Sequence, residues 1–204
     1  TAVTLTTGAD LNVIASGENS TAEIELNGST TFNSADVFTI TASGASSDAD
    51  LYIANASGDV NTISVTASSS DATAEVNIDA GNIAINTDLN VTTSNNAISA
   101  SFEASADVTL EGDVTITAGA DNSEAEVTLD GSTTFNSADT FTVTASGDTS
   151  DADLYIADAS GAVGTISVTA SSSDATAEVN IDAGNITINN DLNVTTSNNA
   201  ISAS

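Results

Sequence analysis

The sequence predicts an all-β fold, a parallel β-helix (β-solenoid) in which every coil contains three short strands. Three observations support this prediction. Residues 62–83 recur unchanged at 165–186, apolar and polar residues alternate with a period of two inside that stretch, and the alternation restarts every 25 to 27 residues. A unit of that length cannot bury its own apolar face, so it becomes stable by stacking on its neighbours.

Residues 62–85 show the three strands of one coil. Apolar side chains occupy every second position from Ile63, again from Ala74 and again from Ile83, which is the pattern of half-buried strands. The polar cluster 68–73 predicts a turn after the first strand, and the DAGN sequence at 79–82 predicts a corner after the second. One coil is therefore expected to have three strands and three corners.

The same register recurs along the chain and predicts about eight coils. The first inward residues of the eight first strands are Leu11, Phe38, Ile63, Leu89, Val114, Phe141, Ile166 and Leu192. Four coils form a superrepeat of 103 residues, which divides a single solenoid over 1–204 into halves of about 1–101 and 102–204. We expect right-handed winding, because connections between parallel strands are nearly always right-handed.

The composition excludes several classes of function. The chain has no Lys, Arg or His against 29 Asp and Glu, so it lacks the cations that bind nucleic acid or anionic headgroups. Its longest apolar runs are far too short to insert into a membrane. The absence of Cys excludes disulfides and thiolate metal sites. Without His, Cys, Lys or Arg the usual catalytic bases and nucleophiles are missing, so we expect no enzyme.

An acidic column is predicted on the outward face of the second strands. The position twelve residues after each start holds Glu23, Asp50, Glu75, Ser101, Glu126, Asp153, Glu178 and Ser204. Carboxylates suit hard cations, so the six acids are candidate metal ligands that bind Ca²⁺ along the fibre. The alternative interpretation is a merely solvated face, and no cofactor is required for the fold. Neither the EF-hand loop nor the glycine-rich nonapeptide signature is present.

Threonine is frequent on the outward face of the first strands, as at Thr66, Thr92 and Thr169. A flat array of this kind is similar to the ice-binding face of some β-solenoid proteins, which gives a second hypothesis: a ligand-binding module that recognises ice or another surface. Asn12, Ile14 and other residues interrupt the array. Threonine is also simply favoured in solvated strands.

The coil length, the strict alternation and the Thr, Asn, Asp and Gly content together resemble repetitive bacterial β-helix surface proteins. Filamentous haemagglutinin-like adhesins and autotransporter passenger regions are examples. The resemblance covers the whole chain and implies an extracellular or cell-surface location with an adhesive, fibrous or matrix role. It implies no site residues.

The two ends of the sequence show no polar cap. Residues 1–5 read as a third strand, and Ser204 falls inside a second strand. We therefore expect copies of the chain to join head to tail into a filament, sheath or adhesin stalk, because such a contact is heterologous and does not close. The alternative is that the sequence is an excerpt from a longer covalent array, in which the same stacking is intramolecular.

Overall fold

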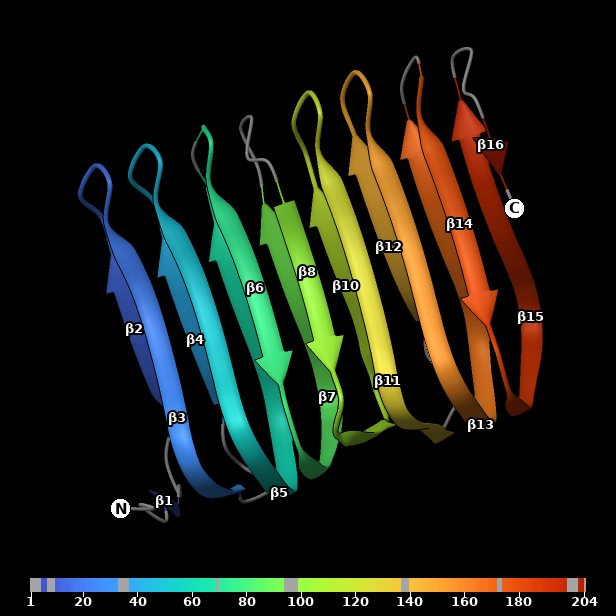
Figure 1. Ribbon diagram of the computed structural model, residues 1–204, viewed down its shortest axis with the longest axis horizontal. Coiled ribbons are helices and arrows are strands. Elements are labelled where there is room, and N and C mark those ends of the chain that lie inside the picture. The colour runs from blue at the N-terminus through green and yellow to red at the C-terminus, as the bar shows by residue number, and fades with distance from the viewer. Residues whose placement is uncertain are drawn as a thin grey trace.

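The computed structural model describes residues 5–6, 10–32, 37–68, 70–93, 99–136, 140–171, 174–197 and 202–203. Sixteen strands belong to one sheet, and every strand pairing is parallel. The sheet winds into stacked coils with the termini at opposite ends of the stack, as Figure 1 shows. The predicted parallel β-solenoid is therefore confirmed.

The first face of the solenoid contains the first strand of each coil. Seven successive pairings connect eight segments in one register, from Leu11↔Phe38 at one end to Ile166↔Leu192 at the other. These segments are β2 (Leu11–Ala15), β4 (Val37–Ala42), β10 (Asp113–Ala118), β12 (Thr140–Ser146) and the C-terminal parts of β5 (Asp48–Ala67), β7 (Gly81–Thr93), β13 (Asp151–Ser171) and β15 (Gly184–Ser197).

The second and third faces complete each coil. The second face contains the N-terminal parts of β3 (Thr21–Phe32), β5, β11 (Glu124–Asn136) and β13, together with β6 (Thr73–Ile78), β8 (Ser99–Ala104), β14 (Thr176–Ile181) and β16 (Ser202–Ala203). The third face contains β1 (Leu5–Thr6), β9 (Asp107–Leu110), the C-terminal parts of β3 and β11, the middle of β5 and β13, and the N-terminal parts of β7 and β15.

The three corners of a coil differ from one another. The corner between the first and second faces is a polar turn, and these turns line up along one edge of the solenoid (Figure 1). The other two corners are mostly bends within continuous strands such as β5, where the register shifts between Leu26 and Ser29 on the paired β3. Three separate strands per coil were predicted, but the long strands β5 and β13 each run through two corners without interruption.

The polar turns share an unusual backbone conformation. One residue in each described turn has a positive φ of 51 to 61°. These residues are Asn19, Ser46, Asp71, Asn122, Thr149 and Asp174. Asn and Asp tolerate this left-handed region well, whereas a β-branched residue such as Thr149 is strained there. The turns also stack on one another, since the Asn19 amide donates a 2.8 Å hydrogen bond to the Ala45 carbonyl.

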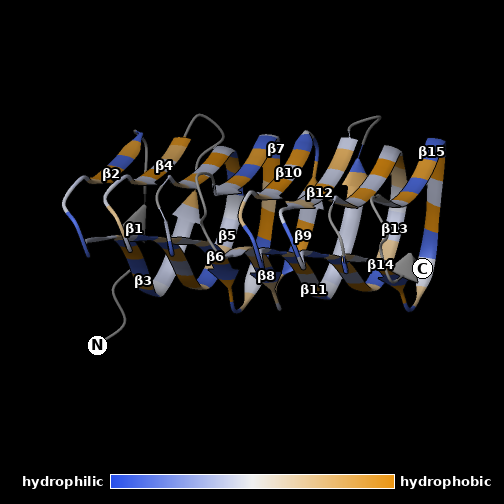
Figure 2. Ribbon diagram, turned by 90° about the horizontal axis from the view of Figure 1, so that it is seen from above, coloured by the Kyte–Doolittle hydropathy of each residue, from blue (hydrophilic) through white to orange (hydrophobic). Residues whose placement is uncertain are grey.

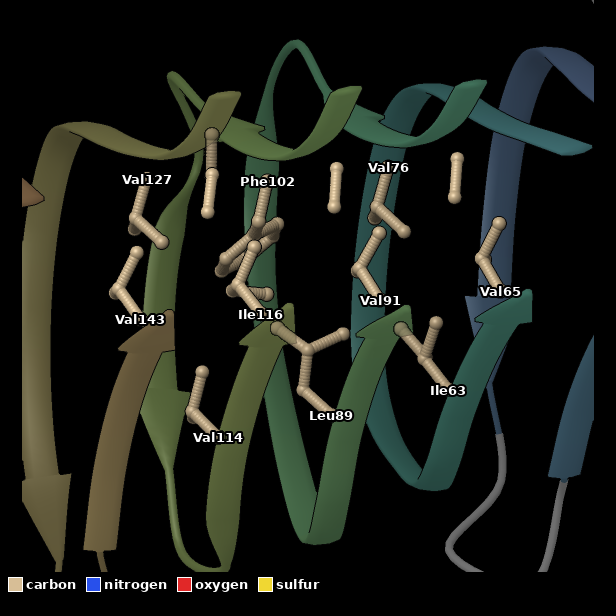
Figure 3. Packing of buried hydrophobic residues seen from close by; sticks show 14 of the residues in the cluster. Ile63, Val65, Val76, Leu89, Val91, Phe102, Val114, Ile116, Val127 and Val143 are labelled. Atoms are coloured by element: carbon tan, nitrogen blue, oxygen red, sulfur yellow. The ribbon is translucent and has the colours of Figure 1, made fainter. Parts of the chain in front are cut away.

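The core is one continuous cluster that fills the inside of the coils. The first-strand residues Ile63, Leu89 and Val114 are at most 2% exposed, and their side chains form a row in Figure 3. Figure 2 shows the same alternation of hydrophobic and hydrophilic residues along successive strands. Since inward residues of each coil contact those of the next, each coil depends on its neighbours for burial.

On the third face, glycines lie where the backbones of adjacent coils approach each other closely. Phe32 pairs with Gly58, and Phe135 pairs with Gly161 in the second half. A Cβ on Gly58, whose φ is +87°, would lie 2.5 Å from the Phe32 carbonyl oxygen. Glycine is therefore required here by both the close approach and the positive φ. The apolar alternation alone does not indicate this pairing.

The end coils are more open than the interior ones. The inward residue Leu192 is 52% exposed, and the inward residues Leu11, Val13 and Val194 are only partly buried against the core. The predictions for residues 1–4 and for Ser204 lie outside the described residues. In the described part of the chain, no helix is long and apolar enough to cross a bilayer.

Candidate functional site

The six acids of the predicted column come together on the second face. Glu23 pairs with Asp50, which pairs with Glu75, and the register continues through Ser101 to a second set of three. In that set Glu126 pairs with Asp153, and Asp153 pairs with Glu178. Neighbouring strands lie about 4.8 Å apart, so each acid in a set of three is close to the next. We call these six residues the acidic column.

The column is electrostatically unfavourable because the chain has no Lys, Arg or His to compensate it. Partial burial, followed by the charges of Asp48, Glu75 and Glu23, raises the pKa of Asp50 to about 7. Partial burial, followed by the charges of neighbouring acids, also raises the pKa of Asp153 to about 6. The middle acid of each set of three is thus the one whose charge is least tolerated.

Among the described residues, uncharged groups supply hydrogen bonds to acids on this face, and most of them are hydroxyls. Thr73 Oγ1 donates a 2.9 Å bond to Asp48 Oδ1, and Thr128 Oγ1 donates a 3.0 Å bond to Glu126 Oε1. The Tyr155 phenol donates a 3.0 Å bond to Asp182 Oδ2. These contacts were not predicted from the sequence. The tyrosine contacts could have been predicted from the sequence spacing. Tyr52 and Tyr155 lie two residues after Asp50 and Asp153, and therefore on the same outward face.

The acidic column does not form a compact metal site. Among the described residues, no group of three or more His, Cys, Asp or Glu side chains is placed to hold a metal ion. The acids form a line with one carboxylate per coil, which is unlike the cage of six to eight oxygens around a tightly bound Ca²⁺. Calcium binding by the column stays a prediction, and it would be of the diffuse kind that neutralises a charged surface.

The first face carries a second ordered array, which contains no charge. Seven threonines lie in register on adjacent strands. Ile14 of β2 occupies the same row at its N-terminal end. We call them the threonine column: Thr41, Thr66, Thr92, Thr117, Thr144, Thr169 and Thr195. The parallel row two residues earlier contains only Asn, Thr and Ser, from Asn12 to Asn193. The interruptions noted in the sequence therefore fall mainly in one row and leave the threonine column continuous.

Comparison with protein-family models, with curated proteins and with solved structures gave no match. Function must therefore be argued from the geometry of this chain.

A small cavity lies in the core beside Phe135 and Phe141, whose rings meet edge to face with centroids 6.0 Å apart. Its volume of about 10 Å³ is close to the minimum for a single water molecule, and its lining is largely apolar. It is too small for a substrate. Among the described residues, the surface features available to a function include the acidic column, the threonine column and the partly exposed apolar residues of the end coils.

Proposed function

We propose that the chain is a structural β-solenoid of the cell exterior that stacks end to end into a filament, sheath or adhesin stalk. The supporting observation is the difference between equivalent residues in an interior and an end coil. Leu89 is fully buried, whereas Leu192, its counterpart in the second superrepeat, is 52% exposed. An uncovered coil exposes apolar surface and unpaired backbone groups, and a further coil would satisfy both.

The surface composition supports the extracellular part of the proposal. A chain with 29 acids and no basic residue repels nucleic acids and anionic headgroups, which removes many intracellular partners. The Thr, Ser and Asn rows form a polar, uncharged strip on the first face, beside an outward row that contains Asp88, Asp113 and Asp191. The resemblance to repetitive surface adhesins points the same way.

We include divalent cations in this proposal because the charge opposes assembly. Joining two copies brings two chains of charge −29 together, and the repulsion must be screened or neutralised. Ca²⁺ along the acidic column would lower it with the oxygen ligands that this cation prefers. The cation is thus proposed to strengthen the fibre without being required for the fold.

Self-association of the purified chain tests the proposal. We expect sedimentation velocity to show species that grow with protein concentration and with Ca²⁺, and electron microscopy to show filaments whose width is that of one solenoid. Leu192→Glu would place a carboxylate in the apolar contact and should abolish growth. Asn190→Glu is the matched control, because it adds the same charge at an exposed position outside the core. A strictly monomeric wild-type chain at high concentration with Ca²⁺ would overturn the proposal.

A second candidate function is recognition of an ordered, uncharged surface such as ice. The observation that favours it is the threonine column, which repeats one hydroxyl per strand over seven adjacent strands. Thermal hysteresis of the purified chain is the direct measurement. Activity at micromolar protein that disappears in Thr92→Lys, and persists in the second-face control Asn77→Lys, would favour this function over a purely structural one.

A further inference from the structure

The boundary between the two superrepeats lies inside the chain, and the structure shows how it is joined. On the first face β7 pairs with β10 in the register Leu89↔Val114, Asn90↔Thr115 and Val91↔Ile116. The inward residues of this junction are at most 2% exposed. The inward residues of the junction are therefore as deeply buried as those of the rest of the core.

Both partners of this junction have counterparts at the open ends of the stack. The sequence of β15 repeats that of β7 with two differences. Thr187 replaces the equivalent Ala84, and Asn190 replaces the equivalent Thr87. The strand β2 corresponds to β10, with Leu11 in place of Val114 and Val13 in place of Ile116. Among the described strands, β15 pairs only with β13 and β2 only with β4, so the counterparts of two surfaces that fit together inside the molecule each have one unpaired edge.

We infer that the partner of β15 is β2 of a second copy of this chain, in the same parallel register as the internal junction. This inference rests on the proposed end-to-end stacking and adds the residues that form the contact. Leu192 would lie beside Leu11, Asn193 beside Asn12 and Val194 beside Val13. The half-exposed Leu192 would then acquire the environment that buries Leu89 completely.

The outward residues are also consistent with this register. Thr195 would lie beside Ile14, so the threonine column would continue into the next copy after one apolar residue. Asn193 and Asn12 would lie side by side, and adjacent Asn side chains can hydrogen-bond along a stack of parallel strands. At the internal junction, Ser101 lies between Glu75 and Glu126, so the acidic column is interrupted where the two halves meet. The repulsion that opposes joining is lowest at this kind of boundary.

Disulfide trapping tests the register directly, because the chain has no cysteine. Adjacent strands place paired Cα atoms about 4.8 Å apart. That separation lies within the range of about 4.4 to 6.8 Å that a disulfide spans. The double variant Asn12→Cys with Asn193→Cys should therefore form a ladder of covalent dimers, trimers and longer chains on oxidation. Non-reducing electrophoresis measures the ladder.

Two control pairs make the outcome specific. Asn90→Cys with Thr115→Cys occupies the internal junction and should form a disulfide within one chain, without a ladder. Thr39→Cys with Asn193→Cys displaces one cysteine by a whole coil, to about 10 Å, and should give no ladder above that of random collision.

The results separate this inference from the proposed function. A ladder from the Asn12 and Asn193 pair that greatly exceeds the displaced control supports the register. Filaments that form while this pair fails to cross-link, or cross-links no better than the displaced control, overturn the register and leave end-to-end stacking in place. A wild-type chain that sediments only as monomer overturns both.

Discussion

The Tyr155 phenol donates a 3.0 Å hydrogen bond to Asp182, which lies one coil further along the stack. Tyr52 makes the same contact with Asp79 in the first half of the chain. In both cases the hydrogen bond to the carboxylate is the main cause that raises the pKa of the phenol above its ordinary value. Each pair therefore links neighbouring coils on the outside of the second face.

We expect the double variant Asp79→Asn with Asp182→Asn to lower the pKa of both phenols, because it removes the charged acceptor from each. The chain has two Tyr and no Trp, so ultraviolet absorbance during an alkaline titration reports only these two groups. Circular dichroism at each pH verifies that the chain remains folded. An unchanged titration curve would show that the phenols do not hydrogen-bond to these carboxylates when the protein is in solution.

Stability should increase as the pH falls from 8 towards 4. The pKa of Asp50 is about 7 and that of Asp153 about 6 in the folded chain, against 3.8 for an ordinary Asp. Over that interval the folded state binds protons that the unfolded state has released, so the free energy of unfolding rises on acidification. Thermal melts across this pH range measure the effect.

Asp50→Asn with Asp153→Asn should melt higher than wild type at pH 8 and show a weaker pH dependence. Asp59→Asn with Asp158→Asn, which removes two exposed carboxylates from the third face, is the matched control for the loss of charge alone. A double variant that follows the wild-type pH profile would assign the effect to general repulsion and not to these two residues.

Calcium should raise the melting temperature more than sodium chloride of equal ionic strength. A cation that binds the folded acidic column better than the unfolded chain stabilises the fold by mass action. Replacing Glu23, Asp50 and Glu75 by Gln, Asn and Gln should reduce the difference between the salts. Equal shifts in both salts for the wild-type chain would reduce the role of the column to ordinary screening.

Thr149→Asn should stabilise the fold by about 1 kcal/mol, because Thr149 has a φ of 57° where β-branched side chains are strained. The equivalent turns use Asn19 and Asn122 at nearly the same φ. Chemical denaturation gives the free energy of unfolding. Thr149→Val keeps the branched side chain and should bring no gain, so equal stabilisation by both variants would argue against backbone strain.

Thr133→Val should also stabilise the fold, by about 1 kcal/mol. The Thr133 side chain is 1% exposed, and its Oγ1 has no hydrogen-bond partner in the described structure. Replacing an unpaired buried hydroxyl by a methyl group of similar shape removes its desolvation cost. Thr187→Val, at an exposed position of the third face, is the control and should change stability little. A loss of stability in Thr133→Val would reveal a partner, such as a bound water.

The sequence was sufficient to predict the faces whose apolar alternation is strict. Ile63, Leu89 and Val114 were placed in one inward row, and the acids of the column were placed in one outward row, because period-two alternation determines both. It was not sufficient on the third face, where Phe32 pairs with Gly58 because a glycine leaves room for the neighbouring backbone. Because glycine has no side chain, a pattern of apolar side chains does not identify it as a residue that pairs with the core. The strain at Thr149 was also not predicted, because the alternation of apolar and polar residues carries no information on the φ of a turn residue.

The internal junction between the two halves has a consequence for how the gene can change. Residues 29–101 and 132–204 are nearly identical, so unequal recombination between them would add or delete one complete superrepeat. An added superrepeat would stack through the same register that pairs β7 with β10. Each event would alter the length of the solenoid by four coils, or about 19 Å at the spacing of parallel strands. The threonine column of the first face would stay in register throughout. Natural variants of this protein are therefore expected to differ in length by fixed steps.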